Sequence, residues 1–467
     1  MFLELALSLP IAVLPQQTAN PRYELGLRTR ALERAWIAAA PELRASVLPQ
    51  VEGAVQRFFA MDMAGVGAAL DEARTKLERT DKPWDLERFT LTPARKLLDA
   101  ADASVKLSLG NLYTTEFAAP VVLTASFEGK PLKLEPARVE APGRGETREL
   151  VLSLESLPRG AAEVTVEIEL ANEGDLRSRR RVSLSRAVQR DERLRAVKAA
   201  LIELPDGAPA LEFLTAQSHL ALLEQLGSAS QQETDYPATR LLSECETILG
   251  ALSDNERWFG PNSTGSSWVT LPNGANGAQV RVFVPEKLAK DQLVPLVVAL
   301  HGAGGSENMF FDAYGDGRIV ELCRQRGWVL VAPRVSFLGA PVEAVVNALA
   351  ERLPLDRSKV FLVGHSMGAG VGQQLLAKKP ADFRAFAALG GGSGLKDASA
   401  LVSKPIFVGA GERDFGRRGA EALHKSLVGA GSESATLRIY PNCEHLMVVV
   451  DALPDVFTFF DAQLAAK

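Results

Sequence analysis

The sequence predicts a protein of the α/β class, in which a mostly parallel sheet covered by helices on both faces follows separate helical and antiparallel β modules. After residue 260, short apolar runs alternate with helical patterns, which is typical of strands buried on both faces. Before that point, apolar residues recur first with a helical period and then with a period of two. A length of 467 residues favours about three folding units, at roughly 150 residues each.

The chain divides into five expected segments. In order, these are an apolar N-terminal segment at residues 1–20, a helical region at 21–110, an antiparallel β module at 111–186, a helical connector at 187–259 and the α/β domain at 260–467. In the helical region, Val47, Val51 and Val55 recur every four residues. Residues 163–170 alternate apolar side chains with Glu or Thr, which predicts a strand with one face in water. Turn-forming residues at 260–267 mark the last boundary.

The composition argues against nucleic-acid binding and against a disulfide or zinc framework. A formal charge of -5 gives no general attraction to phosphates. One basic run stands among acidic segments, and we interpret it as a solvated strand end. It consists of Arg177, Arg179, Arg180 and Arg181. The 3 cysteines are too few for a disulfide framework, although one disulfide stays open, and they lack the paired spacing of a zinc site. The sequence does not indicate an oligomeric state.

The N-terminus resembles the hydrophobic part of a secretory signal. Residues 2–14 are mostly apolar, but no Lys or Arg precedes them and Glu4 interrupts the run. The run is too short to cross a bilayer, so we expect no integral membrane segment. It predicts a secreted or periplasmic protein, and the alternative is a cytoplasmic protein with a buried N-terminal segment.

The expected strands of the α/β domain are short apolar runs between helical patterns. They lie at residues 279–284, 296–300, 328–332, 360–363, 386–389, 406–410 and 437–440. The helical patterns lie at residues 342–352, 370–379 and 420–430. Because the helices fall in the connections, they would cover both faces of the sheet.

The most informative motif is the pentapeptide Gly364-His365-Ser366-Met367-Gly368, between an expected strand and an expected helix. A strand-to-helix turn of this composition is typical of a nucleophile elbow, which lifts a serine hydroxyl clear of the sheet. The flanking glycines are needed because a Cβ there would collide with neighbouring backbone. Ser366 is therefore the candidate nucleophile.

A second glycine-rich loop follows the strand at residues 296–300. It reads His301-Gly302-Ala303-Gly304-Gly305, and it leaves backbone N–H groups free to face a developing oxyanion. The candidate donors are the N–H of Ala303, with Gly304 as an alternative, and the N–H of Met367.

A serine nucleophile needs an imidazole base and a carboxylate to orient that base. Asp414 follows the strand at residues 406–410, and His445 lies on the loop after the strand at residues 437–440. The order Ser, Asp, His is that of the α/β-hydrolases. Alternative sources of the carboxylate are Glu412, Asp451 and Asp455.

These motifs resemble those of the α/β-hydrolase superfamily. Residues 279–464 are similar to serine esterases of the polyhydroxybutyrate-depolymerase-like, feruloyl-esterase-like and dienelactone-hydrolase-like groups. The resemblance implies Ser366 as nucleophile, Asp414 as orienting acid and His445 as base, with no metal or organic cofactor. One departure is Glu444, because these relatives often carry glycine before the catalytic histidine, so the loop backbone must differ there.

The other histidines and the aromatic residues near the loops have alternative interpretations. We expect His365 to pack beside the sheet, His301 to brace the oxyanion loop and His219 to lie on the surface. An aromatic cluster after the oxyanion loop predicts either core packing or the lining of an acyl pocket. It consists of Phe310, Phe311 and Tyr314.

The sequence thus predicts hydrolysis of carboxylic esters through an acyl-enzyme. Only residues 390–404 separate two expected strands where many such folds insert a lid, which favours an open site and short-chain, aryl or polymer-borne esters. Three alternatives stay open: a serine peptidase of prolyl-oligopeptidase-like type, a non-catalytic binding protein on a hydrolase scaffold, and acyl transfer to an acceptor other than water.

Overall fold

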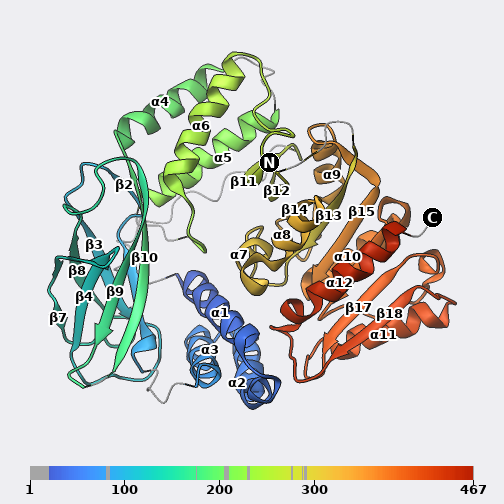
Figure 1. The fold of residues 1–467 in the computed structure, drawn as a ribbon, viewed down its shortest axis with the longest axis horizontal. Helices are drawn as coiled ribbons and strands as arrows, with labels where there is room; N and C mark the ends of the chain where they lie inside the picture. Colours follow the sequence, from blue (N-terminus) through green and yellow to red (C-terminus); the bar gives the residue numbers. More distant parts are fainter. Residues whose placement is uncertain are drawn as a thin grey trace, which may run out of the picture. The chain divides into compact units, whose positions relative to one another are not determined.

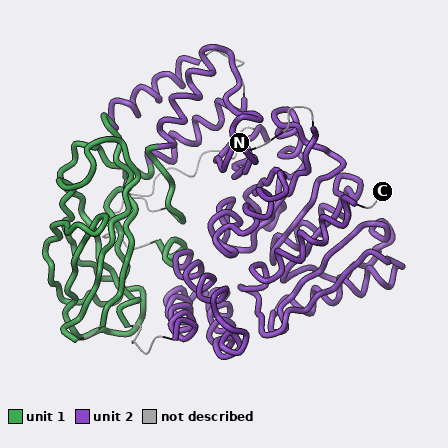
Figure 2. Tube along the Cα trace, viewed as in Figure 1, with its two compact units in different colours: residues 1–24, 83–189, 225–239 green, residues 25–82, 190–224, 240–467 purple. Residues whose placement is uncertain are grey.

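The computed structural model describes residues 20–79, 85–174, 176–204, 210–228, 232–274, 277–286, 288 and 292–465. The signal-like run at residues 2–14 lies outside these ranges. Two compact units make up the chain (Figure 2). The first comprises residues 1–24, 83–189 and 225–239, and the second comprises residues 25–82, 190–224 and 240–467. In the described part of the chain, no helix is long and apolar enough to cross a membrane.

The first unit is built from two sheets that share one apolar core. One sheet has the order β1-β3-β8-β6, and the other has the order β2-β10-β9-β4-β5 with β7 paired to β4. Their strands are β1 Phe89–Pro93, β2 Leu97–Asp99, β3 Ser104–Asn111, β4 Val121–Phe127, β5 Lys130–Leu132, β6 Leu134–Glu135, β7 Arg138–Val139, β8 Thr147–Ser153, β9 Ala162–Ala171 and β10 Arg177–Ala187. In β9 the buried and exposed side chains alternate, as the sequence pattern predicts.

The strands of this unit begin earlier than expected. The helical region was predicted for residues 21–110, whereas its helices are α1 Pro21–Ala38, α2 Pro41–Phe59 and α3 Met63–Leu77, and β1 starts at Phe89. The reason lies in β3, where exposed and buried residues alternate over its first four positions, so the local period is two rather than 3.6.

The second unit is centred on an 8-stranded sheet with the order β11-β12-β14-β13-β15-β16-β17-β18 (Figure 1). The strands from β14 to β18 in this order pair in parallel, and β11 and β12 pair antiparallel at one edge. The strands are β11 Gly265–Leu271, β12 Ala278–Val284, β13 Val294–Leu300, β14 Val329–Pro333, β15 Leu355–His365, β16 Ala385–Leu389, β17 Ile406–Gly411 and β18 Ala435–Tyr440. The predicted α/β fold class is confirmed, but β11 begins inside the stretch that the sequence marked as a boundary loop.

Helices cover both faces of this sheet. One face packs against α8 Tyr314–Arg326 and α12 Val448–Ala465, and the other against α9 Val342–Ala350, α10 Met367–Lys378 and α11 Arg417–Gly429. A short helix, α7 Met309–Asp312, precedes α8. Alternate residues of one strand reach the two cores: Val297 of β13 faces the α8 and α12 side, and Val298 faces the other. Such two-sided burial explains the continuous apolar runs.

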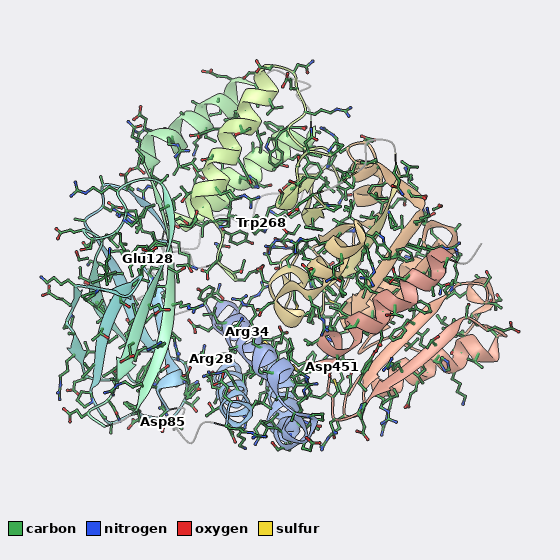
Figure 3. All side chains as sticks on the ribbon, in the orientation of Figure 1. Arg28, Arg34, Asp85, Glu128, Trp268 and Asp451 are labelled. Carbon is green, nitrogen blue, oxygen red and sulfur yellow. The ribbon has the colours of Figure 1, made fainter. Side chains whose placement is uncertain are left out.

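The helices α1 to α3 share a core with the α/β domain rather than forming a module of their own. Trp36 of α1 and Val51 of α2 are fully buried in the cluster that contains α8 and α12. Within the layer, Arg28 and Asp71 form a buried ion pair of 2.8 Å (Figure 3 labels Arg28). Asp451 of α12 lies 3.6 Å from Arg44 of α2, which ties the layer to the domain.

The connector forms α4 Arg190–Glu203, α5 Ala210–Leu226 and α6 Ala238–Ser253. Its α5 is bound to the α/β domain by Glu212, whose carboxylate accepts hydrogen bonds of 2.7 and 2.9 Å from Arg352. The side chain of Glu212 is 0% exposed and that of Arg352 is 11% exposed. His219 of α5, expected on the surface, is instead buried, and its Nε2 lies 3.1 Å from the Trp268 carbonyl. Burial lowers the pKa of His219 to about 4, so it is neutral near pH 7.

Candidate active site

Ser366 occupies the turn between β15 and α10 in a left-handed backbone conformation. Its φ is 52° and its ψ is −113°, which for a residue with a side chain is a strained combination. A Cβ on Gly364 would lie 2.3 Å from the Gly368 carbonyl oxygen, and one on Gly368 would lie 2.0 Å from the Leu300 carbonyl oxygen. Both glycines are therefore required by close backbone packing. Ser366 is half-buried at the carboxyl end of the parallel strands.

His445 lies between Ser366 and Asp414. Its Nε2 is 3.0 Å from Ser366 Oγ, and its Nδ1 is 2.7 Å from Asp414 Oδ1. Asp414 is 5% exposed and His445 is 7% exposed. Because Asp414 accepts at Nδ1, that nitrogen carries the proton and Nε2 is left to accept from the serine hydroxyl. The chain thus brings together the three side chains that the sequence placed on separate loops.

The environment of Asp414 keeps it ionised. Burial alone would raise its pKa, but the hydrogen bond and the charge of His445 and a 2.7 Å hydrogen bond from Gly416 N–H hold the pKa below its usual value. Its second oxygen, Oδ2, has no hydrogen-bond partner within the described ranges. A Cβ on Gly390 would lie 2.9 Å from this oxygen, so a residue without a side chain is needed beside it.

The alternative carboxylates are bound elsewhere. Glu412 accepts a hydrogen bond from Asn442 N–H at 3.1 Å. Asp455 accepts one from the Tyr440 hydroxyl at 2.7 Å. Asp451 forms an ion pair with Arg44 of α2.

The candidate oxyanion loop is a tight turn. Gly305 N–H donates to the Gly302 carbonyl at 3.2 Å, and Gly304 has a φ of 78°, which together indicate a type II β-turn with Ala303 at its second position. The hydrogen bond that closes such a turn does not involve the N–H of Ala303. Met367 is the first residue of α10, so its N–H has no acceptor within the helix.

Buried polar contacts brace this loop. His301 Nε2 accepts a 2.9 Å hydrogen bond from Val335 N–H, and its Nδ1 lies 2.8 Å from the Gly302 carbonyl. The aromatic residues after the loop belong to the core: Phe310 and Tyr314 are 0% exposed. Neither lines the cavity described below.

Glu444 occupies the position where resemblance led us to expect glycine. Its carboxylate turns back and accepts hydrogen bonds of 2.8 and 3.0 Å from the N–H groups of Leu446 and Met447. Burial raises the pKa of Glu444 to about 8, despite these two hydrogen bonds. The side chain therefore fixes the turn that follows His445.

The second helix, α2, forms one side of the site, which no sequence pattern predicted. The ring of Phe58 lies so close to Gly304 that a Cβ there would be 2.7 Å from its Cζ. Phe59 packs edge-on against Phe415 at 5.6 Å between ring centroids, and Phe415 lies 4.0 Å from the His445 ring. The helical period of α2 predicted its buried face, but no sequence signal connects its last turn with loops hundreds of residues away.

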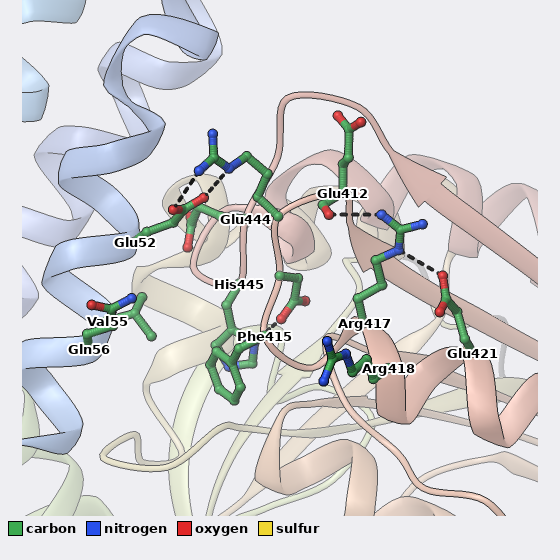
Figure 4. A pocket seen from close by; sticks show the side chains of 12 residues that line it. Glu52, Val55, Gln56, Glu412, Phe415, Arg417, Arg418, Glu421, Glu444 and His445 are labelled. Carbon is green, nitrogen blue, oxygen red and sulfur yellow. Dashed lines mark hydrogen bonds and ion pairs between the residues drawn. The ribbon is translucent and has the colours of Figure 1, made fainter.

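A cavity of about 650 Å³ lies beside His445 (Figure 4). Its walls come from α2, the β17–α11 connection and the His445 loop. The lining residues are Glu52, Val55, Gln56, Glu412, Arg413, Asp414, Phe415, Arg417, Arg418, Glu421, Glu444 and His445. Ion pairs join Glu52 to Arg413 at 2.5 Å and Arg417 to Glu421 at 2.8 Å. The cavity is thus polar, with one exposed aromatic ring over the histidine.

Comparison with known proteins gives partial likenesses. A scan against protein-family models finds no match. The sequence is 28% identical over 152 residues to a probable feruloyl esterase C from Aspergillus flavus, covering 28% of this chain and 55% of that protein. The chain therefore spans about half the length of this curated relative.

Two solved structures show more remote likenesses. A feruloyl esterase module from Clostridium thermocellum has 13% identity and a TM-score of 0.37, covering 43% of this chain and 89% of its own. A thermostable esterase has 14% identity and a TM-score of 0.39, covering 80% and 99%. The fold assignment rests on the sheet and the elbow of this chain itself.

Proposed function

We propose that this protein is a serine hydrolase that cleaves carboxylic esters through an acyl-enzyme. The observation that supports it most strongly is the contact chain from Ser366 Oγ through the His445 ring to Asp414 Oδ1, at 3.0 and 2.7 Å. A serine hydroxyl in hydrogen-bond contact with an oriented imidazole is the arrangement that activates it as a nucleophile.

In the proposed mechanism, His445 removes the hydroxyl proton as Ser366 attacks the ester carbonyl. The N–H groups of Met367 and Ala303, or of Gly304 in its place, would then stabilise the oxyanion. His445 passes the proton to the leaving alcohol, and the same histidine activates the water that releases the acid. Asp414 stays ionised throughout and stabilises the imidazolium, in keeping with its lowered pKa.

The cavity favours a polar leaving alcohol. His445 must protonate the leaving oxygen, so this group departs on the side of the site that His445 faces. That side carries the charged side chains of Glu412, Arg417 and Arg418, and Ser366 is not among the lining residues. Polar walls favour a hydroxylated or polymer-borne alcohol over a long lipid chain. The relatives named as feruloyl esterases support an aromatic acyl group.

Hydrolysis of aryl acetates and methyl ferulate by purified protein tests the proposal. We expect turnover by the wild type and a loss of at least about 10³-fold in Ser366→Ala and His445→Ala. A control is Ser358→Ala, which changes an exposed serine near the start of the same strand, β15. Wild-type turnover that persists in Ser366→Ala would exclude the mechanism.

The same assays separate the alternatives. Faster cleavage of peptide amides than of esters would favour a peptidase. Transfer of the acyl group to added alcohols would favour an acyltransferase. Binding of ferulate esters without turnover would favour a binding protein.

A further inference from the structure

We propose that Tyr314 is a positioning residue, which holds the oxyanion loop, the nucleophile elbow and the His445 loop in one arrangement and links them to helix α1. This inference rests on the proposed function. Tyr314 is completely buried and lies 51 residues away from His365 in the sequence, so of the two alternatives left open by the sequence it does not line an acyl pocket.

The hydroxyl of Tyr314 contacts the nucleophile elbow directly and the oxyanion loop through Met309. A Cβ on Gly305, in the oxyanion turn, would lie 2.5 Å from Sδ of Met309, and the Tyr314 oxygen lies 3.4 Å from the same sulfur. The hydroxyl also lies 2.7 Å from Nδ1 of His365, the residue immediately before Ser366. The hydroxyl has one proton, so it donates to one of these two acceptors at a time.

His365 extends the link to the third loop. Its Nε2 lies 3.1 Å from the backbone carbonyl of His445. Because a carbonyl oxygen only accepts, Nε2 carries the proton, Nδ1 is bare, and the Tyr314 hydroxyl must donate to it. Burial, followed by the neighbouring charge of His445, lowers the pKa of His365 to about 3, so the ring is neutral near pH 7.

Helix α1 fixes the backbone from which this hydroxyl projects. Tyr314 has a φ of 52° and starts a left-handed run that continues through Gly315, Asp316 and Gly317. A large residue rarely adopts this conformation without support from its surroundings. Support comes from Glu33 of α1, whose two carboxylate oxygens each accept a 3.0 Å hydrogen bond, from Tyr314 N–H and Gly315 N–H.

The consequence is that removal of the hydroxyl would loosen the site without touching substrate. In Tyr314→Phe, His365 Nδ1 would lose a buried hydrogen-bond partner, and Met309 would lose its polar contact beside the oxyanion turn. The oxyanion donors and His445 could then shift relative to Ser366. Because misplacement of reacting groups by about 1 Å can lower turnover a hundredfold, we expect kcat to fall about 10- to 100-fold. KM should stay within about twofold, since no substrate contact is removed.

The matched control is Tyr440→Phe. Tyr440 is also buried and donates a 2.7 Å hydrogen bond, to Asp455, and it ends the strand that leads to the His445 loop. We expect kcat to drop in Tyr314→Phe but not in Tyr440→Phe. For both variants, kcat is measured with an aryl ester below the melting temperature of the variant. Equal effects of the two variants, or a Tyr314→Phe kcat within twofold of the wild type, would overturn the proposal.

A second pair of variants tests the link between Tyr314 and α1. This pair also tests the positioning role of Tyr314 if Tyr314→Phe does not fold. Glu33→Ala should lower kcat at least about fivefold, whereas Arg34→Ala should not. Arg34 lies next in α1 and makes an exposed 2.8 Å ion pair with Asp316 of the same left-handed run (Figure 3 labels Arg34). Unchanged kcat in Glu33→Ala would overturn the coupling. Absence of Ser366-dependent hydrolysis in the wild type would be a different result, since it would remove the proposed function itself.

Discussion

Addition of one methyl group to Gly368 should disable the site, because it forces the elbow away from the oxyanion loop. A Cβ at this position would lie 2.0 Å from the Leu300 carbonyl oxygen, whereas real contacts of this kind stay above 3.0 Å. The elbow and the end of β13 must therefore separate by about 1 Å, because both groups are backbone and cannot rotate aside. Such a displacement costs about a hundredfold in kcat. Overpacking of this kind also destabilises by about 1–3 kcal/mol.

The same helix supplies the control for Gly368→Ala. A Cβ on Gly370 would meet nothing within 4 Å, so Gly370→Ala should keep full activity. Its free energy of unfolding should rise by about 0.5–1 kcal/mol, because alanine has the better helix propensity. Steady-state hydrolysis of an aryl ester gives kcat, and thermal unfolding gives Tm. If Gly368→Ala keeps more than a third of the wild-type kcat, or if Gly370→Ala loses as much, the close-packing argument fails.

Three further variants test other parts of the structure. Burial raises the pKa of Glu444 from 4.5 to about 8, so the folded state holds this proton more tightly than the unfolded state does. The contribution of Glu444 to stability, at most about 5 kcal/mol, is therefore fully present below pH 4.5 and is lost as the pH rises through about 8. Tm should fall less steeply between pH 5 and 9 in Glu444→Gln than in the wild type. Arg352→Ala leaves the fully buried Glu212 without its ion-pair partner and should lower the free energy of unfolding, measured with denaturant, by about 3–5 kcal/mol. Lys379→Ala, which breaks an exposed ion pair, should lower it far less. Asp414→Asn should lower kcat by about 10⁴-fold with little change in Tm, and a loss below tenfold would contradict the orienting role.

Local sequence patterns predicted the α/β domain well. Strands buried on both faces appear as short apolar runs, and seven such runs coincide with β12 to β18. The glycines of the elbow were predictable because the need for close backbone approach there is local. Ser366, Asp414 and His445 each follow a strand in the parallel part of the sheet, so their convergence follows from the common direction of those strands.

Long-range contacts were beyond the reach of the sequence. Glu33 and Tyr314 are 281 residues apart, and neither a helical period nor a turn signal reveals that they meet. The left-handed run at residues 314–317 is stabilised by that contact, so the sequence alone indicated an ordinary aromatic cluster. His219 was expected on the surface, whereas the edge strand β11, which was not predicted, covers it.

Covalent labelling by a fluorophosphonate tests the central claim most directly. In the wild type, we expect peptide mapping by mass spectrometry to find the adduct on Ser366. Ser366→Ala should remain unlabelled, and His445→Gln should be labelled at least about a hundred times more slowly than the wild type. An adduct on another residue, or labelling of Ser366 at the same rate without His445, would contradict the central claim.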